Sequence, residues 1–173
     1  GTPWKKSNVP REHALIGLGP AFVTVENYEH LQLVLTEVLG FKLIDAEGSF
    51  HLFEVGEGGN GASIIVEHRE DLPAAQEGYG NVHHLALRVA DEEALRFWIE
   101  KINRLEFPNS GFVERFYFKS EYFLAATHVL FELATDGPGF LEDETYEHAG
   151  EKLSLPPFLE PKRAGIEEFV RPF

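Results

Sequence analysis

Two predicted strands carry the side chains best suited to bind a metal ion. His83 and His84 are adjacent in VHHLALRV, and Glu132 stands in VLFELA. Because side chains alternate along a strand, the two histidines point to opposite faces, and His84 lies opposite the leucine-rich face. Glu132 has apolar neighbours on its own face, where an unpartnered charge is costly. A metal ion bound between His84 and Glu132 would satisfy both.

A second interpretation of the same residues needs no metal. A histidine in a strand is often held by structural hydrogen bonds, and an isolated glutamate often pairs with arginine, so spacing alone leaves both interpretations open. The chain contains no cysteine. This excludes disulfides, thiol nucleophiles and cysteine-bound zinc or iron–sulfur sites, and it leaves His, Asp and Glu as the plausible metal ligands.

The elements that position these residues come from an internal repeat. GPAFVTVENYEHLQLVLTEVLGF aligns with HHLALRVADEEALRFWIEKINRLEF at a spacing of about 64 residues. In each copy an alternating strand pattern runs into a helix N-cap, Asn27 or Asp91. Apolar residues then follow at i, i+4 and i+7, which predicts one buried stripe on each helix: Leu31, Leu35 and Val38, then Leu95, Ile99 and Ile102.

About three short strands follow each helix, which predicts a strand, a helix and three strands per copy. We therefore expect an α+β fold of two tandem βαβββ modules forming a curved mixed sheet. The predicted boundaries are 1–75 for a first module with an N-terminal extension, 76–136 for the module with the metal ligands, and 137–173 for an extended C-terminal tail with a short helix at 163–170. The expected strands are 41–44, 50–55 and 62–67 in the first copy, and 112–118, 120–124 and 129–134 in the second.

The repeat also indicates which copy carries the polar pair. His84 aligns with Pro20, and Glu132 aligns with Val66 when two residues of drift are allowed. Neither Pro20 nor Val66 can bind a metal. The candidate site is therefore special to the second copy.

Composition narrows the remaining classes of function. The 15 basic and 29 acidic residues give a formal net charge of −14, which argues against nucleic acid as a partner. With 43% hydrophobic residues the chain can bury a core, and no apolar run approaches the roughly 20 residues of a membrane span. We expect a cytoplasmic homo-oligomer that binds neither nucleic acid nor membrane.

The repeat resembles the modules of the vicinal oxygen chelate superfamily, which includes glyoxalases, bleomycin-resistance proteins and extradiol dioxygenases. Four segments carry a narrower resemblance, from GYGNVHHLALRV through RFYFKSEYF and VLFELATDGPGF to AGEKLSLPPFLEP. Together they are similar to the C-terminal half of bacterial ring-cleaving dioxygenases of the hydroquinone type. The similarity runs from about Trp4 to the end of the chain.

This resemblance implies a non-haem ring-cleaving dioxygenase. His84 and Glu132 match two of the three protein ligands to Fe(II) or possibly Mn(II), and a two-His, one-carboxylate set leaves positions for a small aromatic substrate and O₂. The resemblance places His83, Arg115 and Tyr122 around the site. Tyr122 and His83 are the candidate acid and base, and Arg115 would orient Tyr122 or bind an anionic substrate group.

The third ligand of the family is a histidine near the start of a longer chain. We therefore expect this chain to be the C-terminal half of a protein about twice as long, with the missing N-terminal half as its partner in the site. The sequence also departs from the family at 125–128, where AATH replaces a Pro-Gly-Gly turn. The remaining histidines do not match the ligand motif: His13, His30, His51, His68, His128 and His148.

Two other functions fit the same fold. One is a metal-free module that binds an aromatic ligand or drug in a cavity between paired modules. The other is a glyoxalase-like isomerase, which needs ligands from both paired modules. Pro20 and Val66 argue against an isomerase site assembled from these two copies, although a dimer could combine copies from two chains.

Overall fold

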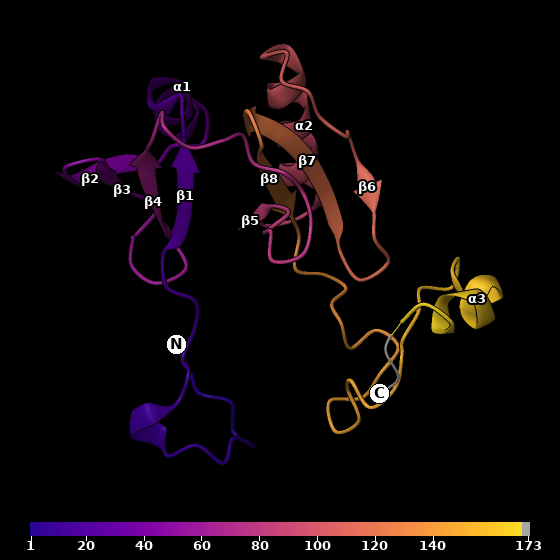
Figure 1. Ribbon diagram of the computed structural model, residues 1–173. Coiled ribbons are helices and arrows are strands. Elements are labelled where there is room, and N and C mark those ends of the chain that lie inside the picture. The colour runs from indigo at the N-terminus through magenta and orange to yellow at the C-terminus, as the bar shows by residue number, and fades with distance from the viewer. Residues whose placement is uncertain (171–173) are drawn as a thin grey trace. The chain divides into compact units, whose positions relative to one another are not determined.

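The computed structural model describes residues 1–170 and divides the chain into two compact units (Figure 1). The first unit comprises residues 1–83 together with 125–129. The second comprises residues 84–124 and the chain from residue 130 onward. Each unit contains one four-stranded sheet, and each is described by itself.

The first unit has the strand order β1-β4-β3-β2. β1 runs parallel to β4, and β3 runs antiparallel to both β4 and β2. This is one βαβββ module, in which the first and last strands are neighbours. Its elements are η1 (Arg11–His13), β1 (Ala21–Val25), α1 (Tyr28–Leu33), η2 (Val34–Val38), β2 (Lys42–Glu47), β3 (Phe50–Glu54) and β4 (Ser63–His68).

The helix of the first unit begins where its cap predicts. The Asn27 side chain accepts a hydrogen bond from the backbone N–H of His30. The helix then continues as a π-helical segment, η2, which the sequence pattern did not predict. Gly40 follows with a φ of 78°, the left-handed conformation that glycine adopts without strain. The predicted apolar stripe is buried, because Leu31 and Leu35 are fully inaccessible.

The second unit repeats this topology with the order β5-β8-β7-β6. β5 runs parallel to β8, and β6 runs antiparallel to β7. The predicted α+β fold with two βαβββ modules is therefore confirmed, and neither sheet is a closed barrel. The elements are β5 (Leu85–Arg88), α2 (Glu92–Arg104), β6 (Val113–Glu114), β7 (Lys119–Ala126) and β8 (Val129–Ala134), followed by η3 (Glu160–Lys162) and α3 (Arg163–Glu167).

α2 covers one face of the second sheet. Its N-cap, Asp91, accepts a hydrogen bond from the backbone N–H of Ala94, and the stripe residues Leu95 and Ile102 are fully buried. Lys119 of β7 bonds to Glu92 of α2, so the face that carries Lys119 is the helix-facing one. Alternation along the strand leaves Tyr122 on the opposite face, which we call the open face of the second sheet.

Two predicted strands are shorter in the structure. The strand expected over 82–89 forms only at Leu85–Arg88, so both histidines precede it. The strand expected over 112–118 forms only at Val113–Glu114, because a tight turn reverses the chain next. In that turn the backbone N–H of Arg115 donates to the carbonyl of Phe118, and Phe116 has a φ of 73°.

The C-terminal segment is anchored to this turn. The Tyr117 hydroxyl donates to Asp143 at 2.8 Å, and the Tyr117 and Phe140 rings stack with centroids 5.3 Å apart. Burial and the neighbouring Asp143 carboxylate raise the pKa of Tyr117 to about 12. The segment contains η3 and α3, and α3 ends at Glu167 rather than at the expected residue 170.

Candidate metal centre

His84 and Glu132 meet on the open face of the second sheet. Nε2 of His84 lies 2.9 Å from Oε2 of Glu132. The Glu132 side chain is only 5% exposed, whereas the His84 side chain is 32% exposed. The imidazole therefore covers the carboxylate and is itself reached by solvent.

Strand register explains this meeting. β5 and β8 are parallel neighbours in which Ala86 pairs with Glu132. His84 precedes Ala86 by two residues, so it continues the same face just before the strand begins. Ala86 is exposed, and its side chain is only a methyl group. Ala86 was not among the predicted site residues, although strand alternation already placed it on the face of His84.

Tyr122 joins the pair from β7. The backbone N–H of Thr135 donates to the carbonyl of Lys119, and counting along this antiparallel pair places Tyr122 opposite Glu132. The Tyr122 ring meets the His84 ring edge to face, with centroids 5.3 Å apart and an interplanar angle of 83°. Three side chains from three adjacent strands or strand ends therefore form one cluster.

Arg115 completes the cluster through Tyr122. Its guanidinium carbon lies 5.3 Å from the centroid of the Tyr122 ring, a cation–π arrangement. The turn that fixes the Arg115 backbone leads directly into β7, which carries Tyr122. The structure thus brings together four of the five predicted site residues.

His83, the fifth, directly precedes His84 in the chain and is exposed. Its predicted role remains a prediction from the resemblance.

Sequence reasoning missed a residue that positions Tyr122. The backbone N–H of Tyr122 donates to the Ser110 hydroxyl oxygen at 2.9 Å, and the backbone N–H of Ser110 donates to the Tyr122 carbonyl at 2.9 Å. Ser110 thus binds the backbone on both sides of the tyrosine. An isolated serine after PN carries no signal in the sequence that would have predicted this contact.

The donor set fits part of a metal site. Oε1 of Glu132 is buried without a hydrogen-bond partner among residues 1–170, which is costly unless a proton or cation satisfies it. Imidazole nitrogen and carboxylate oxygen are ligands suited to Fe(II) and Mn(II). Within the described part of the chain, no group of three or more His, Cys, Asp and Glu side chains is placed to hold a metal. His84 and Glu132 therefore supply two ligands and not a complete set.

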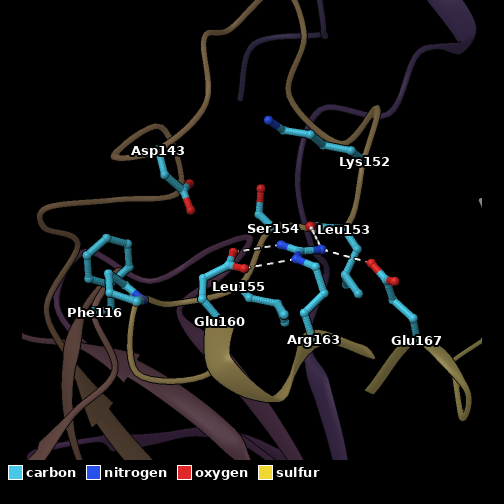
Figure 2. Close-up of a pocket in the computed structure, with 10 residues that line it drawn as sticks. Phe116, Asp143, Lys152, Leu153, Ser154, Leu155, Glu160, Arg163 and Glu167 are labelled. Carbon is cyan, nitrogen blue, oxygen red and sulfur yellow. Dashed lines mark hydrogen bonds and ion pairs between the residues drawn. The ribbon is translucent and has the colours of Figure 1, made fainter. Parts of the chain in front are cut away.

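A separate cavity of about 680 Å³ lies in the C-terminal segment of the second unit (Figure 2). None of the predicted site residues lines it. Arg163 stands at its centre, but the guanidinium is bound by Glu160, by Glu167 and by the backbone carbonyl of Leu153. The Arg163 guanidinium lowers the pKa of Glu160 below its usual range. The arginine therefore holds the segment together and is not available to a ligand.

Two curated relatives match almost the whole chain. The chain is 45% identical to a Bacillus subtilis protein named "Putative ring-cleaving dioxygenase MhqA", over 99% of this chain and 56% of that protein. It is 34% identical to the B. subtilis protein of the same description, MhqO, over 98% of this chain and 54% of that one. The chain thus spans about half the length of the curated relatives it matches. No family model matches the chain.

Solved structures show the same fold. A crystal structure described as a "putative dioxygenase" from B. subtilis superposes with a TM-score of 0.86 at 34% identity, over 99% of this chain and 55% of that chain. A glyoxalase/bleomycin resistance protein/dioxygenase domain from Frankia superposes with a TM-score of 0.62 at 18% identity, over 70% of this chain and 98% of that one. The fold is that of the vicinal oxygen chelate superfamily.

The two modules of this vicinal oxygen chelate fold differ at the site. In the first module Phe22 pairs with Ile65, as Ala86 pairs with Glu132 in the second. Ile65 is therefore the counterpart of Glu132, and the predicted counterpart, Val66, is wrong by one residue. Val66 is fully buried on the helix-facing side. The conclusion is unchanged, because isoleucine cannot bind a metal either.

The helices of both units are short. Among the described residues, no helix is both long and apolar enough to cross a membrane.

Proposed function

We propose that this chain supplies two metal ligands, His84 and Glu132, to a non-haem Fe(II) or Mn(II) site of a ring-cleaving dioxygenase. Its substrates would be O₂ and aromatic compounds of the hydroquinone or catechol type. The relatives named as ring-cleaving dioxygenases support a dioxygenase role.

One observation carries the proposal. Glu132 is a buried carboxylate with one oxygen facing His84 and the other without a partner among the described residues. A purely structural pair would be expected to satisfy both oxygens, because a buried unpaired acceptor destabilises the fold. A cation beside the imidazole would satisfy the second oxygen.

His84 would hold the metal through Nε2 and Glu132 through its carboxylate oxygens. The bound metal would bring the aromatic substrate and O₂ together and pass electron density between them. The third protein ligand would come from residues outside these two units, in keeping with the half-length match to the relatives. The bound ring would lie over Ala86, whose exposed methyl group is the smallest side chain that could stand beside Glu132 without being glycine.

Tyr122 would serve as the acid or base of the reaction. Its ring packs edge-on against His84, so its position is fixed relative to the metal ligand. A phenol beside a bound hydroquinone can take or return a proton at Oη. Arg115 orients Tyr122 from the ring face, and Ser110 fixes the tyrosine backbone.

Metal binding by the chain itself is the first test. Mn(II) binding is measured by electron paramagnetic resonance for the wild type, His84→Ala and Glu132→Gln. We expect both substitutions to weaken binding by at least about tenfold, since even residues that only support ligands contribute 10- to 100-fold. His148→Ala is the matched control, because His148 is an exposed histidine paired with Glu151.

Oxygen uptake is the second test. The chain is reconstituted with Fe(II) without oxygen and then given O₂ with substituted hydroquinones and catechols, alone and together with the other half of a relative such as MhqA. Uptake that requires both halves and both ligands supports the proposal. Metal-independent binding of aromatic ligands that survives His84→Ala and Glu132→Gln, with no uptake, would instead identify a metal-free binding module.

A further inference from the structure

A second buried carboxyl group lies on the other face of the same sheet. Glu121 of β7 is fully inaccessible to solvent, and neither of its side-chain oxygens has a hydrogen-bond partner among residues 1–170. Alternation places it on the helix-facing side with Lys119 and Phe123. The candidate metal centre makes no use of it.

The surroundings of Glu121 are apolar. Phe123 follows on the same face and stacks on Phe131 of β8, with ring centroids 5.9 Å apart. Counting from the Lys119–Thr135 hydrogen bond places Leu133, itself 2% exposed, opposite Glu121. A carboxylate in such a layer would lack both water and donors, which favours the protonated form.

Two cations on the helix-facing side of the second sheet are bound to another carboxylate. On its own strand, Lys119 bonds to Glu92 of α2, and Arg96 of α2 bonds to the other oxygen of the same Glu92. β6 contributes the acidic Glu114, and β8 contributes only apolar side chains to this face. Burial alone raises the pKa of Glu121 to about 7, with no contribution from a neighbouring charge.

We propose that Glu121 is a pH-sensitive element of the second unit, protonated when α2 is packed on the sheet and ionised only as that packing loosens. Above neutral pH the cost of a buried carboxylate weakens the layer between β7 and α2. The same strand carries Tyr122 on its open face, so loosening β7 also loosens the tyrosine of the candidate site. This role does not depend on whether the site binds a metal.

Proton linkage determines whether the stability of the second unit rises or falls with pH. In the unfolded chain Glu121 titrates at the ordinary glutamate pKa of about 4.3. Between that pH and neutrality the folded state binds more protons than the unfolded state, so stability falls as pH rises. Below the ordinary pKa both states are protonated and the group has no effect. We expect the folding equilibrium constant of the second unit to fall by about 10- to 100-fold between pH 5 and pH 8 through this group, since the constant changes about tenfold for each pH unit between the two pKa values.

The experiment compares four proteins across pH 5 to 8: wild type, Glu121→Gln, Glu121→Leu and Glu93→Gln. All carry Trp4→Phe, so that Trp98 of α2 is the sole tryptophan and reports on the second unit. Urea unfolding gives the equilibrium constant at each pH. Glu93 lies on α2 and is exposed, so its variant should follow the wild type. In both Glu121 variants the folding equilibrium constant should no longer fall with rising pH through this group.

A direct titration of Glu121 in the wild type tests the proposal even if a Glu121 variant does not fold. The carboxyl carbon of Glu121 in the wild type is followed by ¹³C NMR, and its resonance is assigned by selective labelling with backbone correlations. A midpoint near neutrality supports the proposal. A midpoint in the ordinary glutamate range, or an unchanged pH dependence in folded Glu121→Gln, would overturn it.

Discussion

The two sheets share one topology but present different open faces. In the first sheet Phe22, Ile65 and Leu52 lie side by side across three strands, and all three are apolar. The corresponding row of the second sheet contains Ala86 and Glu132, with Tyr122 opposite the glutamate. The same backbone register therefore positions an apolar row in one unit and a polar cluster in the other.

This difference separates what the fold requires from what the site requires. Both helix-facing layers are closely packed, because both must bury a helix stripe. The open faces are free to differ, since α1 and α2 pack on the other face of their sheets. Phe22 is 57% exposed and touches Phe50 edge to face, whereas Glu132 is almost fully buried under His84. A buried acid on an open face is thus a property of the site and not of the fold.

The largest loss of stability should come from substitutions in the helix-facing layer that each unit has. Phe53→Ala in the first unit and Phe123→Ala in the second each remove a fully buried aromatic ring. Each substitution should lower the free energy of unfolding of its own unit by about 3–5 kcal/mol. Hydrogen exchange measured unit by unit distinguishes the two, and equal losses in both units from either substitution would show that the units unfold together.

The next largest effect should come from making the open face of the second sheet apolar, as it is in the first sheet. Glu132→Ile places an aliphatic side chain where the first unit has Ile65. Mn(II) binding should fall by at least about 100-fold, because the carboxylate ligand is gone. The substitution removes a buried carboxylate that has one unpartnered oxygen, and it leaves behind an imidazole that solvent already reaches, so the metal-free protein should unfold at the same or a higher urea concentration. A less stable variant would show that Glu132 also supports the fold.

Local signals in the sequence predicted the shared architecture. The caps Asn27 and Asp91 and the apolar stripes that follow them depend on residues only a few positions apart. The structure places them as expected, except that Ile99 of the second stripe is only half-buried. The π-helical turn at Val34–Val38 was not predicted, because it depends on how the stripe packs against its sheet. Register was predicted less well than element type. Between the first and last strands the second module is three residues longer than the first, and the alignment allowed for two, so it made Val66 the expected counterpart of Glu132 in place of Ile65.

The cluster itself was only partly predictable. Alternation placed His84 and Glu132 on comparable faces, and the resemblance added Tyr122 and Arg115. The contacts that join them depend on tertiary structure: the edge-to-face packing of Tyr122 on His84, and the double hydrogen bond from Ser110. The unpartnered Oε1 of Glu132 could be seen only after folding, since burial and hydrogen bonding are not local properties.

The N-caps of the two helices offer a matched comparison with a smaller expected loss of stability. Asn27→Ala and Asp91→Ala each remove the side-chain acceptor that binds the backbone N–H three residues along. Each should lower the stability of its unit by about 1 kcal/mol, measured by urea unfolding. Asp91 should contribute slightly more to stability than Asn27, because its negative charge also interacts favourably with the N-terminal end of the helix dipole. The difference should shrink in high salt, and a difference insensitive to salt would argue against a contribution from charge.

The smallest effect concerns the hairpin turns that precede the last strand of each module. In the first module the turn before β4 contains glycines with positive φ, such as Gly59 at 80° and Gly61 at 82°. In the second module His128 adopts a φ of 62° just before β8, where a side chain is strained. His128→Gly should relieve that strain and raise stability by less than about 1 kcal/mol, because glycine also loses more entropy on folding. Gly61→His is the reciprocal change, and by the same argument it should destabilise the first unit. If urea unfolding showed both substitutions to be destabilising, His128 would be held by contacts that glycine cannot make, and the two turns would not be equivalent.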